Sequence, residues 1–512
     1  MVFAFVAMVG QALTHEVAQK AVEAFGTDSA LTHGSVTVAV YDIDADTLVA
    51  GFNPDMSCIT ASTMKTVTSS SALCLLGPNF TFKTRVYLVG EQKGKKFKGN
   101  IHIVGAGDPT LGSVFFPNSP DIVQEIIGKL KEKGIEKIEG EITVDSSMMP
   151  SPASNGWWEV GDLAWSYGMG IHGFNFFDNR SNLKFTAKDG EILNARFEPA
   201  VPGVQIINRL KSAKNEDNID LRLEEAGPAI VLYGTAANRD YNMRVAIPSP
   251  SALFIDSLSR ALVADGFKLK IKPVKLEKMK KAVKADLVVH QSPTLAAIIT
   301  SLLDRSDNMF TEGVLRAVAY YTGHEATAAA GVQVVDSLWR SKGIDTRAVF
   351  QRDGSGLARA NKISGRFFAQ MLTYMAKHPV DGVTLSQLMP PVRKRIGKLI
   401  PQTPLAENMV VKSGSMNAVQ SFVGYYPAGE KSDGTGRRCT GRTKNIWQHH
   451  QIHQNDSQFQ LRKHVQCNGS QCIPSLPAHA PHPPADSKSA VRYFADHDSV
   501  RPDGCRIPPE AT

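Results

Sequence analysis

The stretch SCITASTMKTVTSSSALCLLG, residues 57–77, predicts a helix that begins near Ala61 and ends at Gly77. Ser62 and Lys65 lie three residues apart in it, so they share one face of the helix. A serine is a weak nucleophile until a neighbouring base removes its proton. Lysine is such a base only when neutral, and burial beside other cations lowers its pKa. This spacing is frequent by chance in a long chain, so the pair needs independent support.

Two further stretches supply that support. Ser306-Asp307-Asn308 opens a predicted helix over residues 308–321, where these residue types are also an ordinary N-terminal cap. Lys412-Ser413-Gly414 closes a β-rich run, which is also an ordinary transition from strand to turn. Together with Ser62-x-x-Lys65, in this order and in these contexts, the three stretches match the motif set of penicillin-interacting serine enzymes. Ser413 replaces the usual threonine and keeps its hydroxyl.

On these motifs the chain resembles the D-alanyl-D-alanine carboxypeptidase/endopeptidase family of class C low-molecular-mass penicillin-binding proteins. Four more stretches carry the resemblance: Gly105-Ala-Gly-Asp-Pro-Thr-Leu111, Ser292-Pro-Thr-Leu295, Ser306-Asp-Asn-Met-Phe310 and Asp353-Gly-Ser-Gly-Leu357. The long gap between Ser62 and Ser306 is typical of the family, in which it holds inserted non-catalytic domains. The resemblance runs from about residue 14 to about residue 427.

The resemblance implies an α+β multi-domain fold. Its catalytic domain would be of the serine β-lactamase/penicillin-binding transpeptidase type, with an antiparallel sheet flanked by helices and a large β-rich insertion. We expect a discontinuous catalytic domain over residues 14–85 and 288–430, and an inserted accessory region over 86–287.

The family's catalytic roles carry over onto matching residues of this sequence. Ser62 would be the acyl-accepting nucleophile and Lys65 its general base. Ser306 would relay a proton, and Asn308 would hold Lys65 and the substrate amide. Lys412 would supply a positive charge and Ser413 a hydroxyl for the substrate's terminal carboxylate, and Gly414 would let the substrate backbone lie along the strand. The backbone N–H groups of Ser62 and Ser415 would form the oxyanion hole.

Four further residues are assigned to substrate binding. Arg359 resembles the family's arginine for the acidic end of the peptide's third residue, although a surface charge is an equally simple interpretation. Asp162 and Tyr167 would lie near the amino group of that residue, or serve only to shape their loop. Asn417 lies where a polar substrate contact is expected.

The activity implied is that of a serine D,D-peptidase of peptidoglycan. It would cleave the terminal D-Ala-D-Ala bond, D-Ala-diamino acid cross-links, or both, through a Ser62 acyl-enzyme, and β-lactams would inhibit it covalently. No metal or organic cofactor is implied. Two alternatives stay open, a serine β-lactamase with the same motifs and a non-catalytic envelope protein. The sequence also leaves carboxypeptidase against endopeptidase preference and the oligomeric state open.

Composition narrows the classes of function. The chain has 512 residues, 42% hydrophobic and 21% charged, which is typical of globular proteins. The sequence contains no run of 18 apolar residues, so no transmembrane helix is predicted. The net charge is +8, but half of this excess lies in residues 431–512, so no concentrated basic face predicts nucleic-acid binding. Cys58 and Cys74 are too few for a disulfide framework.

The two ends of the chain differ from the body. Residues 1–13 form a short apolar run ending in small residues, which we interpret as the remnant of a secretory signal without its basic part. This predicts a periplasmic or envelope location. Residues 431–512 are rich in His, Gln, Cys and Pro and lack apolar periodicity, so we expect a disordered tail foreign to the family. The family's next strand and its C-terminal helix would then be missing, and the exposed sheet would threaten the fold.

Overall fold

The computed structural model of the protein describes residues 15–213, 217–224, 228–273, 283–396, 408–427 and 443–451. The predicted signal remnant and most of the predicted tail lie outside these residues. No helix in the described ranges combines the length and apolarity needed to cross a membrane.

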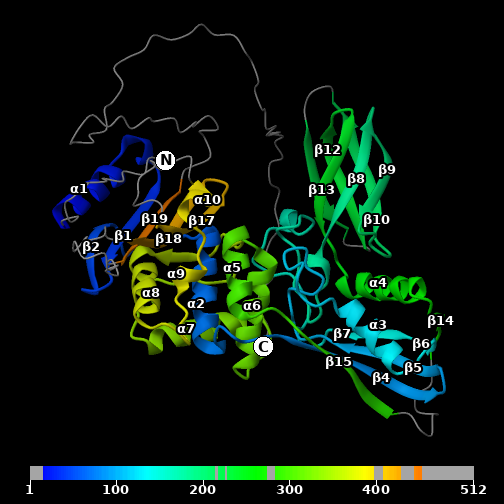
Figure 1. Cartoon of the computed structure of the whole chain (residues 1–512). Coiled ribbons are helices and arrows are strands. Elements are labelled where there is room, and N and C mark those ends of the chain that lie inside the picture. Colours follow the sequence, from blue (N-terminus) through cyan, green and yellow to red (C-terminus); the bar gives the residue numbers. More distant parts are fainter. Residues whose placement is uncertain are drawn as a thin grey trace, which may run out of the picture. The chain divides into compact units, whose positions relative to one another are not determined.

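An antiparallel sheet of five strands carries the catalytic part, in the order β17-β18-β19-β1-β2 (Figure 1). Its strands are β1 (Ser35–Asp42), β2 (Thr47–Phe52), β17 (Val410–Met416), β18 (Val419–Pro427) and β19 (Thr443–Gln451). The N-terminal hairpin and the C-terminal strands thus share one sheet, although some 350 residues of sequence separate them. β17 is an edge strand, and it carries the third sequence motif.

The expectation that the family's next strand is missing is wrong for residues 443–451. β19 lies between β18 and β1 and pairs with both, with Ile446 opposite Gly424 on one side and Val40 on the other. The sequence gives a weak strand signal here because strand prediction relies on alternating side chains. The ladder of a sheet is built from backbone groups, which every residue except proline supplies in full.

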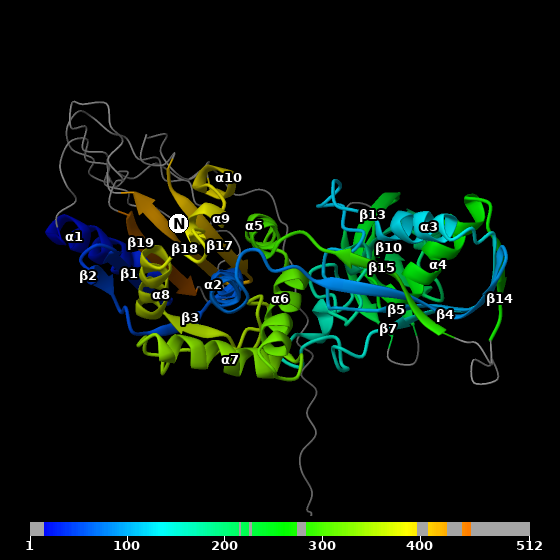
Figure 2. The same ribbon diagram turned by 60° about the horizontal axis from the view of Figure 1, so that its bottom comes forward.

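Helices pack on both sides of the central helix α2, which Figure 2 shows almost end-on. The helices of this part are α1 (His15–Gly26), α2 (Met64–Leu76), α5 (Leu295–Arg305), α6 (Asn308–Tyr321), α7 (Ala328–Ser341), α8 (Gly365–Lys377), α9 (Leu385–Leu388) and α10 (Val392–Ile396). α8 packs on β1 and β19, and α2 contacts α5, α6, α7 and α8. A two-stranded sheet of β3 (Ser57–Ile59) and β16 (Lys362–Ser364) leads into α2.

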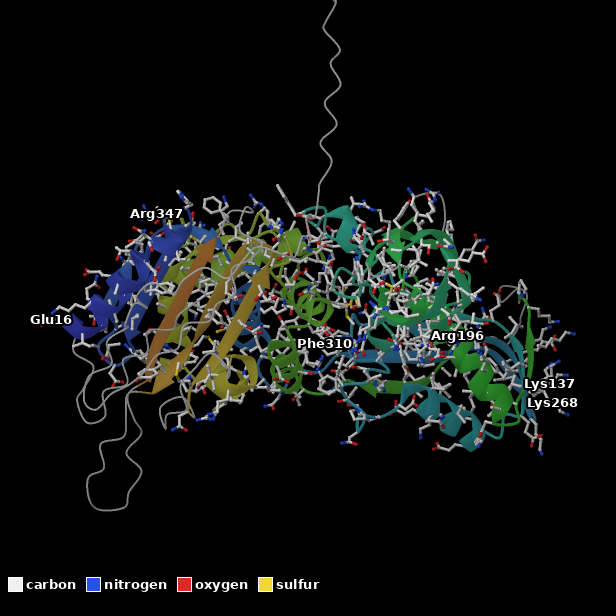
Figure 3. The ribbon with its side chains drawn as sticks, turned by 90° about the horizontal axis from the view of Figure 1, so that it is seen from above. Glu16, Lys137, Arg196, Lys268, Phe310 and Arg347 are labelled. Atoms are coloured by element: carbon white, nitrogen blue, oxygen red, sulfur yellow. The ribbon has the colours of Figure 1, made fainter. Side chains whose placement is uncertain are left out.

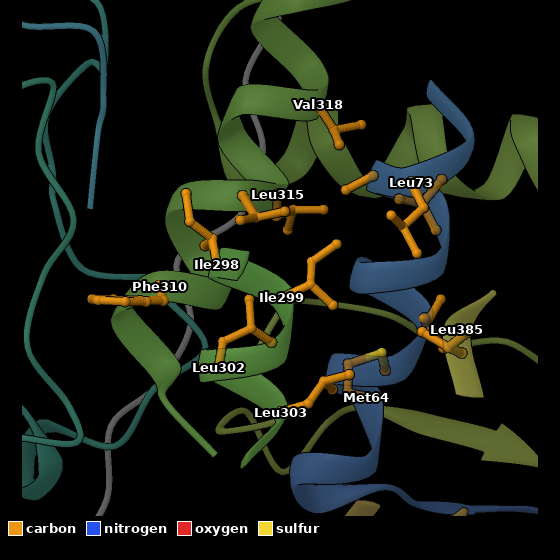
Figure 4. Packing of buried hydrophobic residues seen from close by; sticks show 14 of the residues in the cluster. Met64, Leu73, Ile298, Ile299, Leu302, Leu303, Phe310, Leu315, Val318 and Leu385 are labelled. Atoms are coloured by element: carbon orange, nitrogen blue, oxygen red, sulfur yellow. The ribbon is translucent and has the colours of Figure 1, made fainter. Parts of the chain in front are cut away.

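The sequence of α2 explains its central position. All its residues from Met64 to Leu73 are buried, and most of them are small. Small side chains let α5 and α6 approach α2 closely. Met64 and Leu73 of α2 belong to the same hydrophobic cluster as Ile299 and Leu303 of α5 (Figure 4). Close packing of this kind fixes the rotation of α2, and with it the direction in which Ser62 and Lys65 point.

The inserted part begins and ends on paired strands, β4 (Lys83–Lys93) and β15 (Val283–Gln291). A six-stranded sheet contains them, and two three-stranded sheets follow along the chain. The remaining elements are β5 (Lys96–Val104), α3 (Ile122–Glu132), β6 (Lys137–Gly140), β7 (Ile142–Asp145), β8 (Arg180–Lys188), β9 (Glu191–Glu198), β10 (Gln205–Ser212), β11 (Asn218–Leu223), β12 (Ala229–Ala236), β13 (Arg239–Ala246), α4 (Pro250–Ala264) and β14 (Lys268–Ile271). Lys137 and Lys268 pair across β6 and β14, side by side in Figure 3.

The inserted sheets have hydrophobic clusters of their own, around Phe174 and Phe254 in one case and Leu183 and Leu232 in the other. The main cluster lies around α2, α5, α6 and α8. Separate cores of this kind are what an inserted region requires. The exact domain limits stay a prediction.

Candidate active site

Ser62 lies in a 3-10 turn, η2 (Ala61–Thr63), directly before α2. Lys65 follows one helical turn later, and its Nζ lies 3.0 Å from Ser62 Oγ. The packing of a loop against η2 fixes this corner: a Cβ on Gly356 would lie 1.8 Å from the Ala61 carbonyl oxygen. Only glycine lets the two backbones meet so closely. The predicted nucleophile and base are therefore within hydrogen-bond distance.

The Lys65 side chain is completely buried. Besides Ser62, its Nζ contacts Asn308 Oδ1 and the Ser355 carbonyl oxygen, each at 2.6 Å. Burial lowers the pKa of Lys65 to about 8, while the carboxylates of Asp353, Asp307 and Glu312 act in the opposite direction. With this pKa about one lysine in ten is neutral at pH 7, far more than for an ordinary lysine, and the neutral form is the one that acts as a general base.

Ser306 and Asn308 lie opposite, at the junction between α5 and α6. Ser306 ends α5 in the left-handed conformation, with φ of 60°, and the Asp307 side chain caps α6 by accepting from the Phe310 N–H. Because the backbone bends sharply at Ser306, the Ser306 hydroxyl and the Asn308 amide both point toward the two motif lysines. Asn308 also donates to the Tyr167 carbonyl at 2.8 Å, so it ties Lys65 to the 160s loop.

The third motif lies on the edge strand β17. Lys412 is completely buried, and its Nζ donates to Ser306 Oγ at 2.9 Å. A Cβ on Gly414 would lie 2.7 Å from the Ser62 nitrogen, so the absence of a side chain brings β17 against the turn that holds Ser62. Ser421 of β18 donates to the Thr60 carbonyl at 2.6 Å and locks the same turn to the sheet. Ser413 is half-buried and Ser415 is exposed.

The four peripheral residues form two small groups. Arg359 donates to Glu159 at 2.8 Å and to the Asn417 carbonyl at 3.3 Å. The Tyr167 hydroxyl donates to Asp162 at 3.1 Å. Burial raises the pKa of Asp162, and burial with the adjacent Asp162 raises the pKa of Tyr167 to about 12. Asn417 thus takes part through its backbone.

Three contributors have no counterpart among the residues predicted from the sequence. The Ser355 carbonyl is a backbone group without a sequence signal of its own, although it lies in the quoted stretch 353–357. Glu159 pairs with Arg359 from a distant loop. Glu312 is fully buried and contacts the Ser355 N–H, and its position four residues after Asn308 was the available signal. No three His, Cys, Asp or Glu side chains in the described part of the chain are grouped to hold a metal ion.

This geometry suits acyl transfer. A serine hydroxyl faces a buried amine that can accept its proton, and a second buried cation, Lys412, lies on an open strand edge where an extended peptide can bind. The arrangement supplies a nucleophile, a base and a positive charge for a substrate carboxylate.

Comparisons with known proteins agree with this chemistry. The model of the family "D-Ala-D-Ala carboxypeptidase 3 (S13)" matches residues 18–443. D-alanyl-D-alanine carboxypeptidase DacB of Haemophilus influenzae is 24% identical over 400 residues, which are 75% of this chain and 80% of that protein. The D-alanyl-D-alanine carboxypeptidase of Actinomadura sp. (strain R39) is 24% identical over 396 residues, 72% of this chain and 71% of that protein.

The fold is similar to the crystal structure of penicillin binding protein 4 (dacB) from Haemophilus influenzae. The TM-score is 0.70 at 22% sequence identity, and the match covers 84% of this chain and 93% of that one. The predicted α+β fold class is thereby confirmed.

Proposed function

Because the chain belongs to the D-Ala-D-Ala carboxypeptidase 3 (S13) family, we propose that Ser62 is the nucleophile with which it acts as a serine D,D-peptidase on peptidoglycan. The family and its relatives give the enzyme class, a serine-type D-alanyl-D-alanine carboxypeptidase. The observation that carries the residue assignment is the position of Lys65 Nζ, buried between Ser62 Oγ and Asn308 Oδ1.

The reaction has two halves. Neutral Lys65 takes the proton of Ser62 as Oγ attacks the carbonyl carbon of the penultimate D-Ala, and the N–H groups of Ser62 and Ser415 stabilise the oxyanion. The peptide bond then breaks, and the proton held by Lys65 passes through the Ser306 hydroxyl, which Lys412 contacts, to the departing D-alanine amine, so that Lys65 is neutral again. In the second half water attacks the resulting ester and gives a proton to Lys65, which passes it to Ser62 Oγ as the shortened peptide leaves.

Substrate binding uses the edge of β17 and the peripheral groups. The Lys412 ammonium and the Ser413 hydroxyl face the terminal carboxylate, and Gly414 leaves room for the peptide backbone. Arg359 exchanges Glu159 for the acidic end of the third residue. This exchange is inexpensive because both side chains are exposed, at 42% and 62%, and exposed ion pairs contribute only about 0–1 kcal/mol. Asp162 and Tyr167 face the amino group, and Asn417 completes this side.

Peptidoglycan lies in the cell envelope, so we place the activity there, on the periplasmic side. The same site accepts either a chain end, as a carboxypeptidase, or a cross-link, as an endopeptidase.

The test is incubation of the purified chain with a fluorescent penicillin and, separately, with an acyl-L-Lys-D-Ala-D-Ala peptide. We expect a covalent adduct, mapped to the peptide that contains Ser62 by mass spectrometry, together with release of D-alanine. Slow loss of the adduct indicates the peptidase, whereas rapid penicillin turnover without D-alanine release indicates a β-lactamase. A folded chain that forms no adduct contradicts both and supports a non-catalytic protein.

The rate of acylation should depend on pH through Lys65. The base acts when neutral, and the pKa of Lys65 is lowered to about 8. The second-order rate of acylation by penicillin should therefore rise with pH and level off above about 8, and it should be about 100-fold below its plateau at pH 6. Stopped-flow measurements from pH 5.5 to 9.5 test this. A Lys65→Arg variant, which cannot become neutral, should show no acylation at any pH, and a flat wild-type profile would exclude Lys65 as the base.

A further inference from the structure

The hydrogen bonds of Lys65 constrain the direction of its lone pair. A neutral amine has two N–H groups and one lone pair. The Ser355 carbonyl oxygen and the Asn308 Oδ1 can only accept, and each lies 2.6 Å from Lys65 Nζ. When both N–H groups point to these two acceptors, the lone pair is left facing Ser62 Oγ, 3.0 Å away. The Ser355 carbonyl is therefore as important for this orientation as the Asn308 amide.

The backbone just before the Ser355 carbonyl is held by one carboxylate. Glu312 Oε1 accepts from the N–H groups of both Gly354 and Ser355, each at 2.9 Å. Its Oε2 accepts from Arg316 Nη1 at 3.2 Å. Glu312 is fully buried and Arg316 nearly so. Carboxylates are rarely buried unless they are paired and hydrogen-bonded, and this one uses its partners to hold the loop beside Lys65.

The rest of the loop is fixed by a second carboxylate, which makes the position of Ser355 specific. Asp353 accepts from the N–H groups of Gly356 and Ala358, each at 2.7 Å, from Trp158 Nε1 at 3.0 Å and from Asn361 Nδ2 at 2.8 Å. Asp353 thus holds the Gly356 N–H, which belongs to the same peptide group as the carbonyl that contacts Lys65. Glu312 holds the two N–H groups that precede this carbonyl, those of Gly354 and Ser355.

We propose that Glu312 is a positioning residue for catalysis, which fixes the Ser355 carbonyl so that Lys65 directs its lone pair at Ser62. This inference rests on the proposed roles of Ser62 and Lys65 and adds a residue that acts through Lys65 without touching the substrate. Asn308, Glu312 and Arg316 lie four residues apart on α6, so one face of this helix carries the direct contact to Lys65 and the indirect one.

The test compares three variants of the full chain in acylation by a fluorescent penicillin. Glu312→Ala releases the N–H groups of Gly354 and Ser355, so the Ser355 carbonyl loses the support on one side, and we expect the acylation rate to fall about 100-fold, the effect of misplacing a catalytic group by about 1 Å. Glu312→Gln keeps an oxygen that accepts from both N–H groups, so its plateau rate should return to within about tenfold of wild type. Val318→Ala removes buried volume from the same helix away from Lys65 and should acylate at the wild-type rate.

The pH profile tests whether the Glu312 charge also acts on Lys65, which lost packing alone would not change. The charged groups that face Lys65 are Asp307 and Glu312 on α6 and Asp353 on the loop, and each raises the pKa of the lysine. Removal of the Glu312 charge should lower that pKa, so the acid limb of the acylation rate should move to lower pH in both Glu312 variants. Lost packing alone would leave the limb in place.

The outcomes are distinguishable. If Glu312→Ala, folded by circular dichroism, acylates as fast as Val318→Ala, the inference is overturned. If Glu312→Ala does not fold, Glu312→Asp decides, because the shorter side chain keeps the charge but withdraws the carboxylate from the Gly354 and Ser355 N–H groups; a wild-type acylation rate in Glu312→Asp overturns the inference. A wild-type chain that is not acylated at Ser62 overturns the proposed function itself, and this inference with it.

Discussion

Replacement of Ser62 by alanine should abolish the covalent penicillin adduct and reduce D-alanine release by about 10⁴- to 10⁶-fold. The reason is that the described part of the site offers no substitute nucleophile in the same place. The Ser306 hydroxyl is bound to Lys412, and the Lys65 amine is buried behind Ser62. What remains after the substitution is binding and the oxyanion donors, which act without a nucleophile.

The fold should tolerate this change. Lys65 keeps Asn308 and Ser355 as acceptors, so the loss is one hydrogen bond, about 0.5–1.5 kcal/mol. Ser69 offers a matched control, because it is a buried serine of α2 whose hydroxyl has no hydrogen-bond partner among the residues that the structure describes. Ser69→Ala should be labelled like wild type. Labelling of Ser62→Ala with intact fold, measured by gel fluorescence and thermal unfolding, would show that another residue is the nucleophile.

The sequence is sufficient to locate the residues proposed for the reaction, because they occur in short motifs. Ser62, Lys65, Ser306, Asn308 and Lys412 come from three segments far apart in the chain, and hydrogen bonds join Ser62, Lys65 and Asn308 in one set and Ser306 and Lys412 in another. Each motif also lies on the element predicted for it. Local patterns of residue type are retained when a chemistry demands them, and such patterns can be read without knowledge of the tertiary structure.

The supporting groups were beyond the sequence for two different reasons. Glu159 meets Arg359 only after two loops have folded together, and no spacing predicts such a pair. The Ser355 carbonyl belongs to the backbone, so its role depends on a conformation that Glu312 and Asp353 impose. Glu312 itself was accessible in principle, since a buried acid at i+4 from Asn308 lies on the same helical face.

The strand β19 shows the limit of reasoning from side-chain patterns. Residues 443–451 were assigned to a foreign tail because they lack apolar alternation, yet their backbone pairs with β1 and β18 over the whole strand. The contribution of this backbone pairing to stability can be measured. A substitution that removes a backbone donor without depending on any side chain is the appropriate tool.

Replacement of Gln448 by proline should unfold the catalytic sheet, because β19 is its central strand. Gln448 lies opposite Val38 of β1 and Phe422 of β18. Proline removes the N–H and places a ring where the neighbouring strand must lie. A buried carbonyl left without its donor costs about 1–3 kcal/mol, before the clash of the ring, against a typical total stability of about 5–15 kcal/mol. Gln448→Ala keeps the N–H and is the control.

The effect should reach the active site because the sheet holds Ser62 in place. β18 carries Ser421, whose hydroxyl donates to the Thr60 carbonyl, and β17 brings Gly414 against the Ser62 nitrogen. If β18 loses its partner strand, both contacts lose their support, so Gln448→Pro should lower the unfolding temperature and abolish penicillin labelling, while Gln448→Ala keeps both. Wild-type stability and labelling in Gln448→Pro would mean that residues 443–451 contribute nothing to the sheet, and that β1 and β18 sustain the active site without a strand between them.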